Sequence, residues 1–180
     1  MKRFYLTLGA IIVMAALIPQ ASEMAVSPSS PLASRLCYMF GHANVLHWAV
    51  NGWALMVLHN IFRVYRLIVA YVLAVAVSFI PSVTVSLSLD VPYVAVSSQQ
   101  LPIIGASVIT CFFFGMLNDR LWITDRLTAC LVAALLFIGF FIPGISAVHH
   151  LLMFVAGIAW FQVERIIRSF RKNVMRCNGV

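Results

Sequence analysis

The sequence predicts an all-α membrane protein, a single domain over residues 1–180 that forms a bundle of six transmembrane helices. Hydrophobic residues make up 63% of the 180 residues, charged residues make up 9%, and the mean hydropathy is +1.01. A water-soluble domain of this size has too little interior to bury so much apolar surface. The length accommodates about six helices of roughly 20 residues each, joined by short loops.

The first three expected spans are apolar runs delimited by charged residues. The first follows Arg3, the second ends before Arg63, and the third follows Arg66. Charged side chains are costly in hydrocarbon, so they mark where a helix leaves it. These runs cover residues 4–20, 45–62 and 67–85.

The last three expected spans are delimited in the same way. The fourth ends before Asp119, the fifth follows Arg126, and the sixth ends before Glu164. The Pro143-Gly144 pair is typical of a turn and separates the fifth run from the sixth. These runs cover residues 103–117, 127–142 and 146–163.

The distribution of basic residues predicts the orientation in the membrane. If the amino terminus is cytoplasmic, eleven of the twelve Lys and Arg residues fall on the cytoplasmic side and only Arg35 falls outside. Cytoplasmic loops of membrane proteins carry an excess of Lys and Arg. We therefore expect a multi-pass membrane protein with both termini in the cytoplasm. A minimal six-helix chain without extra domains fits a bacterial inner membrane best. The expected outer loops lie near residues 21–43, 86–102 and 143–145.

The first apolar run also resembles a signal peptide. Lys2-Arg3 precedes it, and it ends near Ala21-Ser22, where small residues suit a cleavage site. Cleavage would remove the first helix from the mature protein. The other five spans would keep their orientation, because the second span starts outside in either case.

Charge and cysteine usage exclude other classes of protein. The net charge is +7, but the basic residues lie between apolar runs and form no patch interleaved with aromatic residues. No nucleic-acid partner is therefore expected. The four cysteines stand singly, without a CxxC pair, so the sequence predicts no disulfide framework, no metal centre and no cofactor.

Polar side chains inside the expected spans are the candidates for function, because an unpaired polar group in hydrocarbon costs several kcal/mol. His47 and Asn51 are four residues apart, so they share one face of a helix. Counting about 1.5 Å per residue from the outer ends of the second, fourth and sixth spans places four polar residues roughly 5 to 10 Å below the outer surface. They are His47, Asn51, Ser107 and His150.

This set of residue types suits acyl transfer. A serine can act as nucleophile, an imidazole can accept its proton, and amide or imidazole donors can stabilise an oxyanion. The five acidic residues lie in outer loops or on the cytoplasmic side. Such a site would therefore be a Ser-His dyad rather than a triad.

The same residues resemble the motifs of rhomboid intramembrane serine proteases. Residues 40–51 read FGHANVLHWAVN and reproduce the family's F-x-H-x4-H-x3-N pattern without a gap. Gly105-Ala106-Ser107 resembles the family's G-x-S nucleophile motif. His150, with Gly157 seven residues later, resembles the catalytic histidine that a glycine follows.

The resemblance implies a six-helix rhomboid-like bundle and an intramembrane serine endopeptidase. It would cleave the transmembrane segments of other membrane proteins near the extracytoplasmic face, with those substrates and the lipid bilayer as partners. Ser107 would be the nucleophile and His150 the base. His47, Asn51 and the Ser107 backbone N–H would hold the oxyanion. By the same analogy, His42 braces the first outer loop, and Gly105 and Gly157 support the site.

Three positions in the expected spans depart from the family pattern. Val108 follows the serine where glycine is usual, Met153 stands where a small residue follows the histidine, and Cys111 stands where an aromatic ring often stacks on the imidazole. The family's outer-loop Trp-Arg motif is also missing, and Ser34-Arg35 lies near its place but one residue out of register. Close approach of membrane helices depends on small residues. We therefore expect Val108 and Met153 to hold the fourth and sixth spans apart.

Three alternatives stay open from the sequence. His149 is the neighbouring candidate for the base, although the spacing to Gly157 favours His150. A catalytically inactive rhomboid-like protein would bind client transmembrane helices, but such relatives typically lack the serine or the histidine. A histidine-rich metal enzyme or a transporter is disfavoured, because the acids lie away from the polar layer and no inverted repeat is visible.

Overall fold

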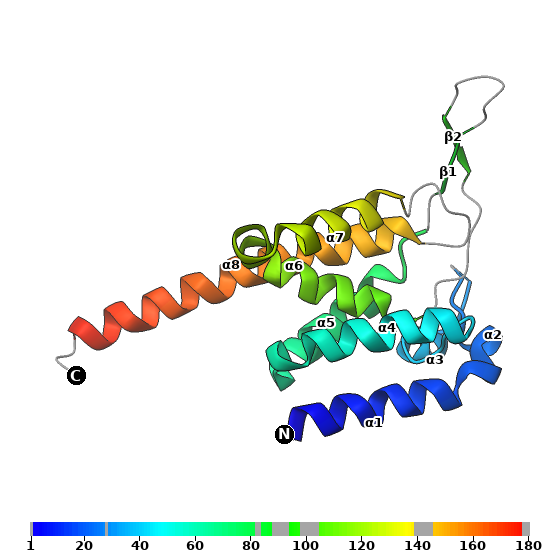
Figure 1. Cartoon of the computed structure of the whole chain (residues 1–180), viewed down its shortest axis with the longest axis horizontal. Coiled ribbons are helices and arrows are strands. Elements are labelled where there is room, and N and C mark those ends of the chain that lie inside the picture. The colour runs from blue at the N-terminus through cyan, green and yellow to red at the C-terminus, as the bar shows by residue number, and fades with distance from the viewer. Residues whose placement is uncertain are drawn as a thin grey trace.

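The chain is helical, apart from one short pair of strands, over the residues that its computed structural model describes. The helices pack side by side, and the hairpin projects from one end of the molecule (Figure 1). This confirms the predicted helical class. The described residues are 2–27, 29–81, 84–87, 94–97, 105–138 and 146–177.

Most of the expected spans correspond to one helix each. The amino-terminal part contains α1 (Lys2–Ala16), the 3₁₀ helix η1 (Ile18–Gln20), α2 (Ala21–Met24), α3 (Leu32–Cys37), α4 (Val45–Leu58), the 3₁₀ helix η2 (His59–Ile61) and α5 (Val64–Val77). The carboxyl-terminal part contains β1 (Thr84–Leu87), β2 (Val94–Ser97), α6 (Ser107–Thr124), α7 (Arg126–Ile138) and α8 (Ala147–Cys177).

Helix α4 begins at Val45, where the sequence predicts the second span. The Asn44 side chain accepts a hydrogen bond of 2.8 Å from the backbone N–H of His47. Asparagine is a preferred residue at this position, because its oxygen satisfies a donor that the first turn leaves unpaired. The cap therefore holds the first turn of α4 in place around His47.

Helix α5 ends earlier than expected. The third span was predicted to reach residue 85, but α5 stops at Val77, and the Ser78 hydroxyl donates a bond of 2.6 Å to the Val75 carbonyl. Pro81 follows three residues later, and proline cannot continue a helix. Residues 84 and 85 instead belong to β1, which pairs antiparallel with β2 so that Val85 faces Val96. The expected loop at 86–102 thus contains paired strands where it is described.

The last three helices are shifted relative to the expected spans. Helix α6 begins at Ser107 rather than 103 and continues to Thr124, past the expected end at 117. Helix α7 begins one residue before its expected start, and residues 139–145, with the predicted turn, lie outside the described residues. Helix α8 continues without a break to Cys177, well past residue 163.

Asp125 makes the turn between α6 and α7. Its carboxylate accepts a bond of 3.0 Å from the Thr128 backbone N–H and one of 2.6 Å from the Thr128 hydroxyl. These bonds lower the pKa of Asp125, the hydroxyl contributing most. Asp125 therefore caps the start of α7.

Helix α6 lies at the centre of the molecule and packs against α4, α5, α7 and α8. Phe112 and Phe113 on α6 are fully buried, and the Phe113 ring lies 4.7 Å from that of Phe62. Helix α1 packs on the outside of α4, where the Trp48 indole donates a bond of 2.9 Å to the Ile11 carbonyl. The helices that carry the candidate site thus surround one apolar core.

An ion pair joins α5 and α8 at the end of the molecule away from the starts of α4 and α6. The Arg66 guanidinium donates bonds of 2.8 and 2.5 Å to the Glu164 carboxylate, and the Trp160 indole donates another of 3.1 Å. Both charged side chains are largely buried. A buried charge is tolerated when its partner and its hydrogen bonds are supplied, and this carboxylate has both.

One described helix, Ala147–Met175, is long and apolar enough to cross a membrane by itself. Three shorter apolar helices cover Arg3–Ala16, Val64–Val77 and Arg126–Ile138. The expectation of six membrane-crossing helices therefore stays a prediction.

Candidate active site

Ser107 is the first residue of α6, and a tight turn at Gly105 directly precedes it. Gly105 has a φ of +106°, which residues with a side chain rarely adopt. Its N–H donates a bond of 2.9 Å to the Tyr38 carbonyl. This turn fixes the start of α6, so that the Ser107 N–H is one of the unpaired donors at a helix N-terminus.

His150 lies in the first turn of α8 and faces Ser107. The distance between His150 Nε2 and Ser107 Oγ is 2.7 Å, and both side chains are half-buried. The two residues are 43 positions apart in the chain and belong to neighbouring helices. The structure therefore brings the predicted nucleophile and base into hydrogen-bonding contact.

His149 points elsewhere, because neighbouring residues on a helix differ by about 100° in direction. It is fully buried, its Nε2 lies 2.7 Å from the Ile80 carbonyl, and its Nδ1 contacts the Ser146 hydroxyl. These contacts tie the start of α8 to the end of α5. Of the two histidines that the sequence leaves open, His150 is the one at Ser107.

His47 and Asn51, on α4, lie next to Gly105. A Cβ atom at Gly105 would fall 2.7 Å from His47 Cε1 and 3.7 Å from Asn51 Nδ2. The Asn51 amide donates a bond of 3.0 Å to the His47 carbonyl, one turn earlier in α4. The two predicted oxyanion donors thus share one face of α4 and line the turn that leads into Ser107.

His42 lies behind His47. It is fully buried, and its ring meets that of His47 edge to face, with the centroids 5.1 Å apart. Its Nδ1 lies 3.3 Å from the Phe40 carbonyl, whereas Nε2 has no hydrogen-bond partner among the described residues. Burial, with a further contribution from His47, lowers the pKa of His42, so its imidazole is neutral at pH 7. His42 is thus packed between the loop before α4 and the first turn of that helix.

Helices α6 and α8 approach closely through a reciprocal pair of glycines. A Cβ at Gly157 would lie 1.9 Å from the Phe112 carbonyl oxygen, and a Cβ at Gly115 would lie 2.0 Å from that of Phe154. Only glycine allows backbones to pack at such distances. Ser107 and His150 each lie about two turns before the glycine of their own helix.

The expectation that larger residues hold these helices apart is therefore wrong. Val108 and Met153 are buried in the core on the inner sides of α6 and α8, so they fill space next to the crossing without preventing it. The crossing itself depends on Gly115, which was not among the predicted site residues. Its signal in the sequence is its spacing, because it follows Ser107 by eight residues as Gly157 follows His150 by seven.

Arg35 has a role that its position in the sequence does not reveal. It is the one basic residue expected outside, yet it is fully buried. Its guanidinium donates to the carbonyls of Ser27, Ser30 and Ser78 and lies 4.2 Å from the centre of the Phe79 ring. Arg35 thus fastens the chain before α3 to the end of α5, next to the elements that hold the site.

The arrangement contains the parts that nucleophilic catalysis requires. A hydroxyl touches an imidazole nitrogen, backbone N–H groups open at the start of α6, and His47 and Asn51 line the adjoining turn. Within the described part of the chain, no group of three or more His, Cys, Asp or Glu side chains is arranged to hold a metal ion.

Comparisons with protein-family models, curated proteins and solved structures find no match to this chain.

Proposed function

We propose that this protein is a rhomboid-type intramembrane serine endopeptidase. One observation carries the proposal, namely the 2.7 Å contact between Ser107 Oγ and His150 Nε2 at the starts of two closely packed helices. A hydrogen bond from the nucleophile to a base is the geometric requirement for activating a serine. The motif spacing adds support, because the residues that resemble the family's motifs are also the ones that meet in space.

In the proposed reaction, Ser107 Oγ attacks the carbonyl carbon of the scissile peptide bond while His150 Nε2 takes its proton. The negative charge that forms on the carbonyl oxygen is held by the Ser107 N–H, His47 and Asn51. The C–N bond then breaks, and His150 returns the proton to the leaving amine. Water hydrolyses the remaining ester by the same steps, with His150 again as base.

The substrate would be a transmembrane segment of another protein, cleaved near the outer face. Ser107 and His150 lie in the first turns of α6 and α8, and His47 lies in the first turn of α4. In the proposed six-span bundle, these helix starts face the outer surface, so the dyad sits about one turn below it. A peptide bond becomes reactive there only after its helix unwinds, and polar groups are needed to satisfy the freed backbone.

A cleavage assay in proteoliposomes tests the proposal. The substrates are single-span proteins, and cleavage is followed by the appearance of the two fragments. We expect Ser107→Ala and His150→Ala to abolish cleavage, and Asn51→Ala to slow it by roughly 10- to 1000-fold, as removal of one oxyanion donor does. Ser29→Ala is the matched serine control, because Ser29 is exposed in the segment before α3, and it should cleave normally.

A fluorophosphonate probe gives a second readout that needs no substrate. The probe should label the wild type and Ser29→Ala but not Ser107→Ala. If labelling shows no dependence on Ser107 under conditions in which a control rhomboid reacts, the protein is not a serine hydrolase. The inactive helix-binding relative would then be the better reading. If His149→Ala abolishes cleavage while His150→Ala does not, the assignment of the base is wrong.

A further inference from the structure

The carboxyl-terminal part of α8 extends beyond the rest of the molecule. Helices α6 and α8 run parallel, and Asp119 on α6 lies level with Gln162 on α8, 3.4 Å away. The end of α6 is therefore level with about residue 167, and α8 continues for about ten more residues, or ~15 Å. The projecting segment is visible at the carboxyl terminus in Figure 1. Residues 165–175 are all exposed.

This segment has two chemically different sides. One side, here called the basic side of α8, consists of Arg165, Arg168, Arg171 and Lys172. The opposite side carries Ile166, Phe170 and Val174, spaced four residues apart and exposed to 68%, 69% and 41%. A basic helix with an exposed apolar stripe is typical of segments that lie at a membrane surface.

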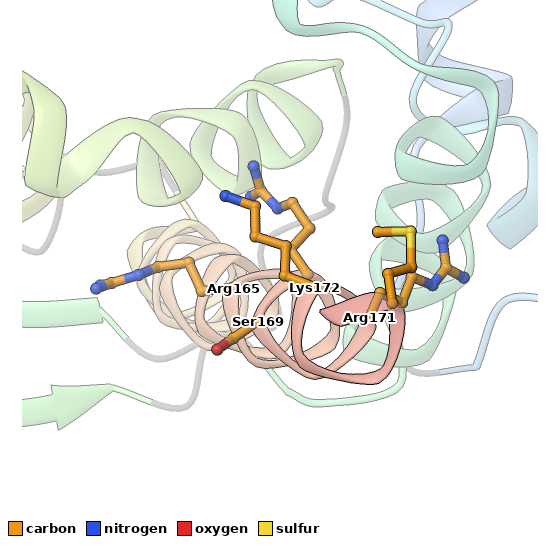
Figure 2. Close-up of a pocket in the computed structure, with 6 residues that line it drawn as sticks. Arg165, Ser169, Arg171 and Lys172 are labelled. Carbon is orange, nitrogen blue, oxygen red and sulfur yellow. The ribbon is translucent and has the colours of Figure 1, made fainter. Parts of the chain in front are cut away.

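The cations of the basic side surround one open pocket of about 500 Å³, which Ser169 and Met175 also line. In Figure 2, Lys172 points away from α8 between Arg165 and Arg171, which extend to either side. Arg168 reaches Glu164 at 3.5 Å, and Arg165 reaches Asp119 at 3.7 Å, so these two charges are partly compensated. Arg171 and Lys172 form no ion pair within the described part of the chain. They supply the uncompensated charge.

We propose that the basic side of α8 binds the headgroups of anionic phospholipids in the cytoplasmic leaflet. The proposal rests on the membrane crossing of α8 in the proposed function, but not on the protease activity. Lipid is favoured over nucleic acid because the boundary between headgroups and acyl chains offers anions to the basic side and apolar surface to the neighbouring stripe. A nucleic acid would leave Ile166, Phe170 and Val174 uncovered.

The length of α8 agrees with this position. Its 31 residues span ~46 Å, slightly more than the 40–45 Å of a bilayer with its headgroup layers. With His150 near the outer surface, the hydrocarbon core ends about 20 residues after the helix begins. Arg171 and Lys172 then lie in the cytoplasmic headgroup layer, where anionic lipids attract basic side chains.

The test uses the full-length protein in a zwitterionic detergent. It is titrated with phosphatidylglycerol, or with phosphatidylcholine of the same acyl chains, and native mass spectrometry counts the bound lipids. We expect preferential binding of phosphatidylglycerol. The double variant Arg171→Gln/Lys172→Gln should weaken that binding about 30-fold, because each basic residue near an anionic surface contributes a factor of about five. Thermal unfolding should be unchanged, since both side chains are exposed.

The matched control is Arg63→Gln/Arg126→Gln. It removes the same charge from two exposed residues at the expected cytoplasmic ends of other helices, and we expect a loss of less than about threefold, because separated exposed charges are screened. Equal losses in the two double variants, equal binding of the two lipids, or displacement of the lipid by equimolar inorganic phosphate would overturn the proposal. Cleavage is assayed on the same samples, so failure of the protease proposal is seen separately.

Discussion

The turn at Gly105 requires glycine for two reasons, its backbone conformation and the space beside it. Its φ of +106° excludes most side chains, and the space where a Cβ would lie is taken by the His47 ring. The same residue donates its N–H to the Tyr38 carbonyl and so ties the loop before α4 to the start of α6. Gly105 therefore acts as a positioning residue for both Ser107 and His47.

We predict that Gly105→Ala strongly impairs the proposed activity. The added Cβ would lie 2.7 Å from the His47 ring, so the ring or the turn must move, and backbone strain of about 1–3 kcal/mol is added. Cleavage should fall more than about tenfold, as an oxyanion donor is displaced. The control is Gly9→Ala on α1, which meets no atom within 4 Å and should cleave normally. Equal activity of the two variants would contradict the role given to this turn.

At the scale of secondary-structure elements, the crossing of α6 and α8 determines whether Ser107 and His150 meet. Gly115 and Gly157 each sit against a carbonyl of the other helix, so the crossing is held from both sides. Toward the other end, Arg66 on α5 pairs with Glu164 on α8. The glycine contact and the ion pair thus fix the position of α8 at two points. His150 lies about two turns before the glycine contact, toward the start of the helix.

We predict that Gly157→Ala separates the two helices. The new Cβ would lie 1.9 Å from a backbone oxygen, which cannot rotate away as a flexible side chain can. Overpacking of this kind typically costs about 1–3 kcal/mol of stability. The melting temperature in detergent should fall, and cleavage should fall further than stability alone explains, because His150 moves away from Ser107. Gly9→Ala serves again as the control, and an unchanged melting temperature in Gly157→Ala would contradict this account of the crossing.

At the scale of the whole molecule, the described helices share a polarity that suits one orientation in a membrane. The starts of α4, α6 and α8 gather around the candidate dyad, whereas Arg66, Asp119 and Glu164 lie toward the other end. The end with the dyad is the one that the basic residues predict to be outside.

We therefore predict that the carboxyl terminus is cytoplasmic. Green fluorescent protein fused after Val180 should fluoresce, and alkaline phosphatase fused there should be inactive. Alkaline phosphatase inserted after Ser29, in the expected first outer loop, should be active instead. The reverse pattern would place the dyad on the cytoplasmic side, and the proposed cleavage near the outer face would then be wrong.

The sequence alone predicts the helical class and the candidate site residues, with His149 left as an alternative to His150, because apolar runs and motifs such as residues 40–51 are local properties of the chain. It locates helix ends less well, since caps such as Asp125 and breaks such as Pro81 act over a few residues that hydropathy averages out. Tertiary structure alone decides that His150 rather than His149 faces Ser107, that Gly115 opposes α8 and that Arg35 is buried. These outcomes depend on which surfaces of distant segments come into contact. The sequence gives the direction of a side chain around its own helix, but only the packing of the helices decides what that side chain meets.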